Sequence, residues 1–568
     1  MRFQRFSDRL EAEKKAVAAL VAEGWVYRAE WHVDEANGTV TADVDFEAGG
    51  QLREAKLVFP FVYPFCPLQI MPRADGVRWS EHQWPNGELC LEFRSDNWRD
   101  TFDARDMLQS ARRLLDTEAT CDDAGIPLQV ASAHRVTEGQ LLARYALHLI
   151  MTDTLKAELY RRVTGVQLLD IHEVTHDNCI VLIAVGVAGS PEHERWIDPG
   201  VPAHFSASPN SVARVAVLEK GDDRHLALLN EGLTPDEVWQ RFSAIPFDGH
   251  GTVIGLINGV ALGKWLAKKV YDIGEVPMDN QQRSLVRNSR VAGKRVAIVG
   301  CGSMGSKVAA SLARSGVTKF LLIDGDVMKA GNVERNDLDW NAIGAHKVDG
   351  VAKRLRAIRP DVDIERWIGR LGAQYSTGNV LTCLEQLAEC DLIVEGTASG
   401  QGFGYAASVA TIEQIPMVWG RVFGGGYGGY VTRCRPGLER SPLEVRHEIH
   451  LWLTQPDFPK PPKDSDIDYG AEPDDQAPMI ADDTDVSVIS AHLARMALDT
   501  LRPVEETDYP FSAYVIGLRK EWIFEQGPFD TFSVTLQPPE PSDKLEAKDQ
   551  EAVAPAPGAD ADPNVETA

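Results

Sequence analysis

The strongest constraint on the fold of this chain is a glycine-rich turn at residues 295–316, RVAIVGCGSMGSKVAASLARSG. The apolar run from Val296 to Val299 predicts a buried strand, and the Ala- and Leu-rich stretch after the turn predicts a helix. The turn carries glycines at the spacing GxGxxG, namely Gly300, Gly302 and Gly305. Such glycines let the backbone approach a phosphate, to which the helix N-terminus presents free N–H groups. The motif therefore predicts a nucleotide site, without choosing between NAD and other nucleotides.

Strand and helix patterns keep alternating to about residue 400, through KFLLID, DVDIERW and CDLIVEG, which predicts a doubly wound parallel sheet. At 568 residues the chain is too long for one hydrophobic core, so we expect a multidomain protein. The expected parts are an α+β domain over residues 1–118, an α/β middle domain over 119–290, the doubly wound α/β domain over 291–538 and a disordered tail over 539–568. The tail is predicted from its Pro-, Ala- and acid-rich composition.

The two parts before the glycine turn have weaker patterns. Residues 3–22 predict an amphipathic helix, followed by an antiparallel meander in GWVYRAEWHV, GTVTADVDFE and QLREAKLVFP and by a helix near 104–116. In the middle domain, GQLLARYALHLIMTDTLKAELYRRV predicts helix, and CIVLIAVGV, VARVAVLE and GTVIGLI predict strands. The run HEVTH at 172–176 spells a zinc-protease motif, but its β-rich setting predicts a strand, in which the two histidines lie about 13 Å apart. We expect no metal site there.

Charge and cysteine usage exclude several classes of partner. The net charge is −26 with a pI near 5.0, and no basic stretch offsets it, so no nucleic-acid partner is expected. The chain has no apolar run of about 18 residues, so no membrane partner is expected and a cytoplasmic location is the default. The eight cysteines are scattered without a CxxC pair, which argues against disulfides and against a cysteine-based zinc site.

Polar residues beyond the second strand of the sheet narrow the choice of nucleotide. Asp324 ends that strand, in a position to hold ribose hydroxyls, with Asp326 beside it. Asn332 and Arg335 follow as NxxR, and Lys347 follows in GAHK. In nucleotidyl transfer, negative charge develops on the α-phosphate and the departing pyrophosphate, and positively charged side chains stabilise it. Arg335 and Lys347 therefore favour nucleotidyl transfer over hydride transfer.

The run GxGxxG, LIDxD, NxxR and GxxK resembles the adenylation domain of ubiquitin-activating (E1) and ThiF/MoeB-type enzymes. The resemblance implies ATP and Mg²⁺ as cofactors, phosphate contacts from the three glycines, Asn332, Arg335 and Lys347, and a ribose contact from Asp324. The family usually has an Asp near position 398 for Mg²⁺. This chain has Ala398 there, with Asp391 and Glu395 nearby in the sequence, so Asp326 becomes the candidate helper. It also implies a homodimer, to which Arg287 and Arg290 are candidate contributors.

A second resemblance explains the N-terminal domain. NGELCLEFRSDNW resembles the active-site segment of ubiquitin-conjugating (E2) enzymes, with Cys90 eight residues before Trp98, and FVYPFCP resembles their YP segment. Cys90 is then the thiolate that captures an activated carboxylate as a thioester. The family's His-Pro-Asn element is altered: His82, Pro85 and Asn86 are spread out as HQWPN. Asn86 and His82 are the candidate helpers, and His82 has an alternative structural role.

The whole arrangement resembles bacterial E2–E1 fusion proteins of CBASS-type antiphage operons. It implies a ubiquitin-like protein, or one with a ubiquitin-like tail, and a conjugation target as partners. These fusions usually have a second cysteine after the adenylation core, but no cysteine follows Cys434 here. Four alternatives stay open for the step after adenylation. The acyl group passes directly to Cys90, or Ser487 or Ser490 carries it as an oxyester. Otherwise Cys434 takes part, or the chain is a variant altered at its cysteine. So do two other functions: a ThiF/MoeB-like sulfur-carrier adenylyltransferase without conjugation, and a catalytically impaired ubiquitin-like-binding scaffold.

Overall fold

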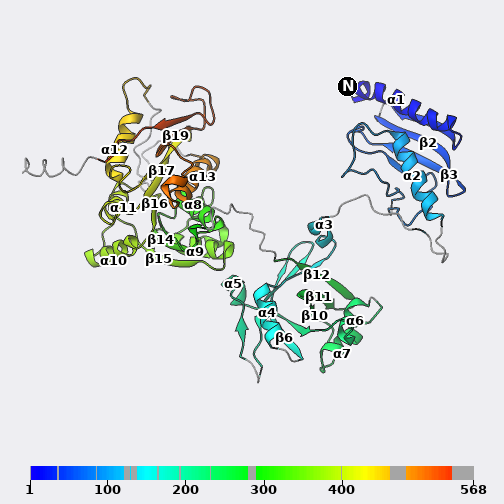
Figure 1. Cartoon of the computed structure of the whole chain (residues 1–568), viewed down its shortest axis with the longest axis horizontal. Coiled ribbons are helices and arrows are strands. Elements are labelled where there is room, and N and C mark those ends of the chain that lie inside the picture. The colour runs from blue at the N-terminus through cyan, green and yellow to red at the C-terminus, as the bar shows by residue number, and fades with distance from the viewer. Residues whose placement is uncertain are drawn as a thin grey trace, which may run out of the picture. The chain divides into compact units, whose positions relative to one another are not determined.

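The computed structural model describes residues 2–34, 37–84, 86–120, 128, 137–162, 165–190, 194–230, 232–278, 290–397, 399–460 and 481–539. The chain divides into two compact units, Met1–Arg144 and Tyr145–Ala568, and each is taken by itself (Figure 1). In the part of the chain that is described, no helix is both long and apolar enough to cross a membrane.

The first unit is an antiparallel meander with one helix before it and one after it in the chain, and both helices share a core with the sheet. Its elements are α1 (Arg2–Ala22), β1 (Val26–Asp34), β2 (Thr39–Ala48), β3 (Gln51–Phe59), β4 (Gln69–Pro72), α2 (Ala104–Glu118) and the short α3 (Glu138–Leu142). The strands pair in the order β1-β2-β3-β4, so the predicted meander is confirmed and gains a short fourth strand. Alternate residues of β2, from Val40 to Ala48, are buried, which gives the sheet one core face. A capping box between Asp103 and Asp106 starts α2 at the predicted residue.

The segment from 145 to 276 is dominated by strands. Its elements are β5 (Leu147–Ile150), α4 (Asp153–Arg161), β6 (Val166–Thr175), β7 (Ile180–Val187), β8 (Trp196–Ile197), α5 (Ala203–Ser206), β9 (Ser211–Val217), α6 (Asp223–Leu229), α7 (Pro235–Phe242), β10 (Gly251–Ile257), β11 (Val260–Leu266) and β12 (Val270–Val276). The sheet runs β5-β12-β11-β10-β9-β6-β7, and β5 also pairs with β7, which closes it into a barrel.

One element of the middle part differs from the prediction. The stretch GQLLARYALHLIMTDTLKAELYRRV, predicted to be helical, contains strand β5 between the helices α3 and α4. Leu147 and Leu149 of β5 alternate into the barrel core, and this pairing with two distant strands overrides the local helical pattern. The strand prediction for HEVTH is confirmed, since His172 lies within β6.

The last part is the predicted doubly wound domain. Its elements are β13 (Arg295–Val299), α8 (Ser303–Arg314), β14 (Lys319–Asp324), η2 (Ala330–Asn332), η3 (Trp340–Ala342), α9 (Lys347–Ile358), β15 (Asp363–Ile368), α10 (Thr377–Ala388), β16 (Leu392–Glu395), α11 (Gly400–Ile412), β17 (Met417–Val422), β18 (Gly428–Cys434), α12 (Pro442–Leu453), α13 (Asp483–Thr500), η4 (Val504–Glu506), β19 (Ala513–Gly517) and β20 (Thr531–Val534).

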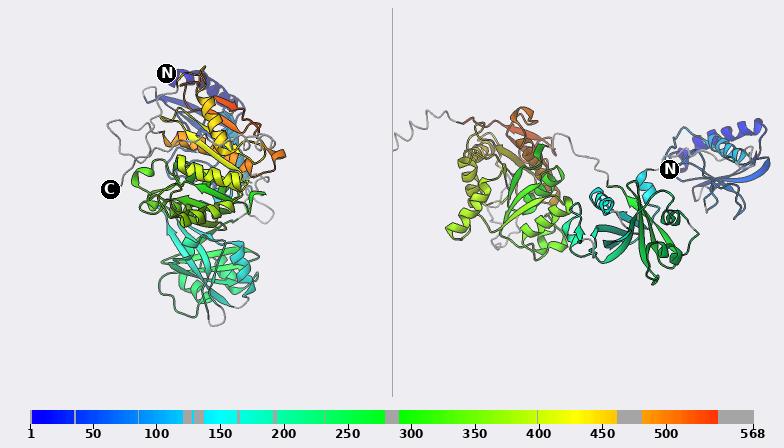
Figure 2. Two further views of the ribbon diagram at one scale, coloured as in Figure 1. Left: turned by 90° about the vertical axis from the view of Figure 1, so that its left-hand side faces the viewer. Right: turned by 60° about the horizontal axis from the view of Figure 1, so that its bottom comes forward.

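The strand order of this sheet fixes where a ligand can bind. The order is β15-β14-β13-β16-β17-β18-β19-β20; the strands from β15 to β17 are parallel, and the last three are added antiparallel. Helices α8, α9 and α13 contribute to the core on one face of the sheet, and α10, α11 and α12 contribute to the core on the other face. Figure 1 labels the two sets on opposite sides of the sheet, and Figure 2 gives two further views. Strands β14 and β15 are added on one side of β13, and β16 and β17 are added on its other side. The point between β13 and β16 is therefore the switch point, where doubly wound folds bind ligands at the carboxyl ends of the strands.

Candidate functional site

The glycine turn lies at this switch point and is sterically tight. Gly300 has φ +94°, and a Cβ there would lie 2.9 Å from the backbone of Gly396. A Cβ on Gly305 would lie 1.8 Å from the carbonyl oxygen of Gly300. Gly302, by contrast, begins α8 without a side-chain cap, and a Cβ there would meet nothing within 4 Å. The first turn of α8 thus opens onto free space, which fits a phosphate group.

Asp324 braces the turn from the end of β14. One carboxylate oxygen accepts the Cys301 N–H at 2.7 Å, and the other accepts the Asp326 N–H at 2.8 Å. Burial raises the pKa of Asp324, although these backbone hydrogen bonds and Lys347 oppose the rise. A carboxylate offers about four lone-pair sites, so Asp324 keeps acceptor capacity for ribose hydroxyls.

Lys347 is the first residue of α9, and its ammonium lies 2.8 Å from the Asp326 carboxylate. That hydrogen bond lowers the pKa of Asp326. The Lys347 side chain is only 12% exposed, so the cation is held close to the acidic end of β14. Sequence reasoning predicted both residues for the nucleotide site, and the structure brings their side chains together at the carboxyl end of β14.

The NxxR segment is fastened to the turn by a residue that sequence reasoning missed. The amide of Asn336 donates to the Cys301 carbonyl at 3.2 Å, and the next N–H, of Asp337, donates to the Ser306 hydroxyl at 3.1 Å. Arg335 therefore sits beside the turn, with its guanidinium 3.4 Å from the Ala481 carbonyl. The Asn332 amide oxygen accepts the Lys329 N–H at 3.0 Å, within its own short helix. The signal for Asn336 in the sequence was its position as a polar residue directly after the NxxR motif.

The acids considered for Mg²⁺ do not gather at one place. Asp391 directly precedes β16, at the amino ends of the strands, and its carboxylate accepts a hydrogen bond from the Arg295 N–H at 2.8 Å. Glu395 ends the same strand at the opposite edge, buried, with its carboxylate accepting the Thr397 N–H at 2.8 Å; burial raises its pKa. Asp391 therefore lies away from the glycine turn, because the whole length of β16 separates the two. Position 398 lies outside the described residues.

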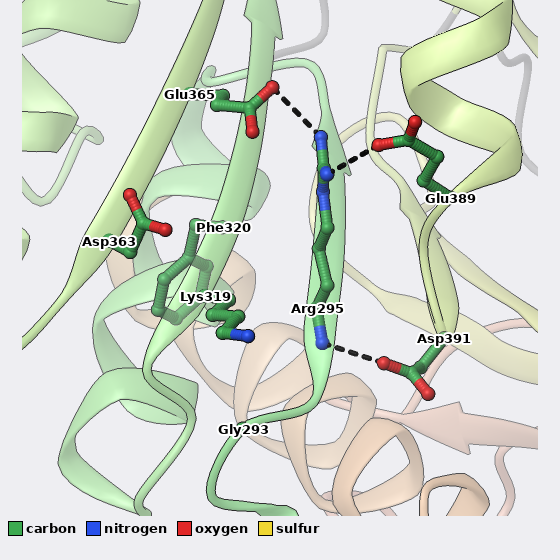
Figure 3. Close-up of a pocket in the computed structure, with 8 residues that line it drawn as sticks. All are labelled: Gly293, Arg295, Lys319, Phe320, Asp363, Glu365, Glu389 and Asp391. Carbon is green, nitrogen blue, oxygen red and sulfur yellow. Dashed lines mark hydrogen bonds and ion pairs between the residues drawn. The ribbon is translucent and has the colours of Figure 1, made fainter.

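A cavity of about 340 Å³ lies at this amino edge. Figure 3 shows the Arg295 guanidinium between Glu365 and Glu389, at 2.9 and 2.7 Å, with its backbone N–H toward Asp391. The lining has two cations, Arg295 and Lys319, against four carboxylates, so it stays net negative, and it lies on the side of the sheet away from the nucleotide motif. Among the described residues, no group of three or more His, Cys, Asp or Glu side chains could hold a metal ion.

Cys90 of the first unit is half-buried and follows a bridge between Gln83 and Leu89. Its N–H donates to the His82 carbonyl at 2.7 Å, so the structure brings these two residues together through the backbone. The Cys90 sulfur accepts a hydrogen bond from the Arg94 guanidinium at 3.0 Å, a contact that sequence reasoning missed. The Asn86 amide oxygen instead accepts the Glu88 N–H at 3.2 Å, within its own turn. Pro85 lies outside the described residues.

The YP segment and the tryptophan after Cys90 meet as one cluster. The Trp98 indole N–H donates to the Pro64 carbonyl at 2.7 Å, and the Trp98 and Tyr63 ring centroids lie 6.2 Å apart. The Tyr63 hydroxyl donates to the fully buried carboxylate of Glu13 on α1. The segments quoted for the E2 resemblance are thus in contact around the loop that carries Cys90.

The alternative nucleophiles have less suitable surroundings. Cys434, at the end of β18, is buried, which raises the pKa of its thiol to about 12, and its Sγ donates to the Arg440 carbonyl. Cys301 is fully buried within the turn, and burial raises the pKa of its thiol well above the usual range. Ser490 is 2% exposed, and Ser487 lies one turn away on α13, its hydroxyl 3.4 Å from the Asp483 carboxylate. Residues 469–480 lie outside the described residues.

One segment of the chain matches a known protein family. Residues 276–442, which contain the glycine turn, Arg335 and Lys347, match the model of the ThiF family. This segment, which is less than a third of the chain, is therefore similar to the E1-like adenylation domains of that family.

Individual relatives cover limited parts of the chain. It is 29% identical over 136 residues to the ATP-dependent ubiquitin transferase-like protein Cap2 of Pseudomonas aeruginosa, covering 23% of each chain. It is 40% identical over 86 residues to ubiquitin-like modifier-activating enzyme 5 of Drosophila pseudoobscura pseudoobscura, covering 15% of this chain and 22% of that protein. It is 32% identical over 158 residues to the uncharacterized protein y4oA of Sinorhizobium fredii, covering 26% and 27%. The alignments thus span about a quarter of each relative's length.

Among solved structures, E. coli MccB with ATP is 17% identical, with a TM-score of 0.33 over 45% of this chain and 67% of that one. So low a score supports no argument about function.

Proposed function

We propose that this protein uses ATP to adenylate the C-terminal carboxylate of a ubiquitin-like protein and carries the acyl group as a thioester on Cys90 to a target. The observation that carries the proposal is the adenylation domain itself. Its glycine turn is open at Gly302, and Arg335 and Lys347 are both held beside it. The names of two relatives, a ubiquitin transferase-like protein and a ubiquitin-like modifier-activating enzyme, support the substrate class.

The first step is nucleotidyl transfer. A carboxylate oxygen of the partner attacks the α-phosphorus of ATP, the bond to the bridging oxygen breaks, and pyrophosphate leaves. N–H groups at the start of α8 hold phosphate oxygens, and the positive charges of Arg335 and Lys347 stabilise the charge that develops. Asp324 binds the ribose, and Asn332 contacts phosphate. Mg²⁺ would neutralise phosphate charge, with Asp326 as the acid nearest to Lys347.

The second step is acyl transfer. The Cys90 thiolate attacks the carbonyl of the acyl adenylate, a C–S bond forms, and AMP leaves. A nucleophile of the target then displaces the thiolate. We favour direct transfer to Cys90, because burial disfavours ionisation of Cys434 and limits access to Ser490. From the resemblance to antiphage fusion proteins, we further propose a role in antiphage defence, with the cytoplasm as the location.

The test is ATP–pyrophosphate exchange by the full chain with purified bacterial ubiquitin-like proteins. Arg335→Ala and Lys347→Ala should each slow exchange about 10²–10³-fold, the scale for one preorganised electrostatic group. Lys353→Ala is the matched control, because Lys353 is an exposed cation on the same helix as Lys347. Unchanged exchange in both site variants would refute the assignment. Exchange without any reductant-sensitive adduct would favour a sulfur-carrier type of reaction.

A further inference from the structure

The loop after Cys90 places a cation against the sulfur. The Arg94 guanidinium nitrogen Nη1 lies 3.0 Å from Cys90 Sγ, and both residues belong to the segment between the Gln83–Leu89 bridge and α2. We propose that Arg94 is a positioning residue that stabilises the Cys90 thiolate and aims it for acyl transfer. This proposal rests on the proposed function and deepens it, because neither resemblance nor motif spacing assigns Arg94 a role.

The loop holds Arg94 in place by its own hydrogen bonds. The Arg94 N–H donates to the Asn97 amide oxygen at 2.8 Å, and the Asn97 amide donates to the Glu92 carbonyl at 2.7 Å. The Trp98 N–H donates to the Arg94 carbonyl at 2.8 Å, while the Trp98 indole is fixed to the YP segment. The Glu92 N–H donates to the Ser110 hydroxyl of α2 at 2.9 Å. These contacts fix the backbone of Arg94, so its side chain extends toward the Cys90 sulfur from a defined position in the loop.

Other polar groups near Cys90 are engaged elsewhere. The Asn86 amide oxygen is used by its own turn, and His82 meets Cys90 through its backbone carbonyl. The charged and titratable groups of the surrounding segments include Glu88, which accepts from Gln69, and Glu92, which pairs with Arg113 of α2. They also include His82, and Asp96 and Arg99 of the same loop. Arg94 is therefore the charged group with a direct contact to the sulfur in the described part of this loop.

The chemistry follows from thiolate reactivity. The thiolate is the nucleophile, and a nearby Arg favours it over the thiol. When the thiol ionises, its proton passes to solvent base, and the N–H···S contact from the guanidinium becomes a hydrogen-bonded ion pair. In the transfer step the S–C bond forms as the C–O bond to AMP breaks, and Arg94 keeps the sulfur oriented without taking part in bond exchange.

The experiment measures the rate of Cys90 alkylation by iodoacetamide in the full chain, as a function of pH, with mass spectrometry of the Cys90 peptide. Arg94→Gln should slow alkylation near pH 7 about tenfold, the scale of one charge-assisted hydrogen bond. The difference should vanish at high pH, where the thiol ionises without help. Arg94→Lys should restore part of the rate. Arg99→Gln is the matched control, because Arg99 is exposed in the same loop.

Cys66, in the same unit and likewise half-buried, provides an internal reference. Its alkylation should not change. Identical Cys90 profiles in wild type and Arg94→Gln would overturn the proposal. So would a slowing that persists at high pH or extends to Cys66, because that result indicates a disturbed fold. The assay uses neither ATP nor a partner: a shifted profile in a chain that forms no thioester would refute the proposed function and leave the role of Arg94 standing.

Discussion

Replacing Gly305 by alanine should disable the nucleotide site. The new Cβ would lie 1.8 Å from the Gly300 carbonyl oxygen, whereas real Cβ contacts essentially never fall under 3.0 Å, so the two must separate by at least 1.2 Å (3.0 minus 1.8). Neither side can yield freely, because Gly305 is buried within α8 and Gly300 itself abuts the Gly396 backbone. A displacement of about 1 Å in a binding site costs roughly 10²-fold in rate, and such overpacking costs about 1–3 kcal/mol of stability.

The assay is ATP affinity by titration calorimetry, with thermal unfolding of the same samples. Gly305→Ala should weaken ATP binding, slow ATP–pyrophosphate exchange about 100-fold and lower the free energy of unfolding by about 1–3 kcal/mol. Gly302→Ala separates the two effects: its Cβ meets nothing within 4 Å, so stability should be kept while the methyl group intrudes on the phosphate space. Gly404→Ala, also unobstructed but in α11, should leave ATP affinity unchanged. Wild-type affinity and stability in Gly305→Ala would refute the reasoning.

Three further predictions concern the carrier, the core and assembly. Cys90→Ala should leave ATP–pyrophosphate exchange intact and abolish a reductant-sensitive adduct on a non-reducing gel; an adduct that persists would show another carrier. Asp499→Asn should cost about 3–5 kcal/mol by leaving buried Arg433 without its counter-charge. Burial raises the pKa of Asp499, but hydrogen bonds from Thr507, the Asp508 N–H and Arg433 bring it below its usual value. The stabilisation is thus present above the unfolded pKa near ~3.9 and fades as pH falls through the folded value, so denaturation curves of the two proteins should converge in acid. The resemblance implies a homodimer through the adenylation domain, and a monomer by light scattering at micromolar concentration would contradict it; Arg287 lies outside the described residues, and Arg290 pairs with Glu506.

Local sequence patterns determined the elements around the nucleotide site. The apolar run into GxGxxG specified β13, the turn and α8, because only glycine tolerates the positive φ of Gly300 and the close approach at Gly305. The alternating pattern of β2 likewise specified a strand with one buried face. These features depend on residues that are neighbours in the chain, so periodicity and glycine spacing are sufficient to predict them.

Tertiary structure decided the features that join distant segments. Closure of the middle barrel requires β5 to pair with both β12 and β7, and no local pattern encodes two such partners. The pairing of Arg433 on β18 with Asp499 on α13 spans 66 residues, and Asn336 reaches Cys301 across 35. The contact between Arg94 and Cys90 spans four residues, yet depends on a non-repeating loop fixed by Trp98 and Asn97. Side-chain contacts of this kind arise from the packed geometry of the whole domain, which sequence periodicity does not report.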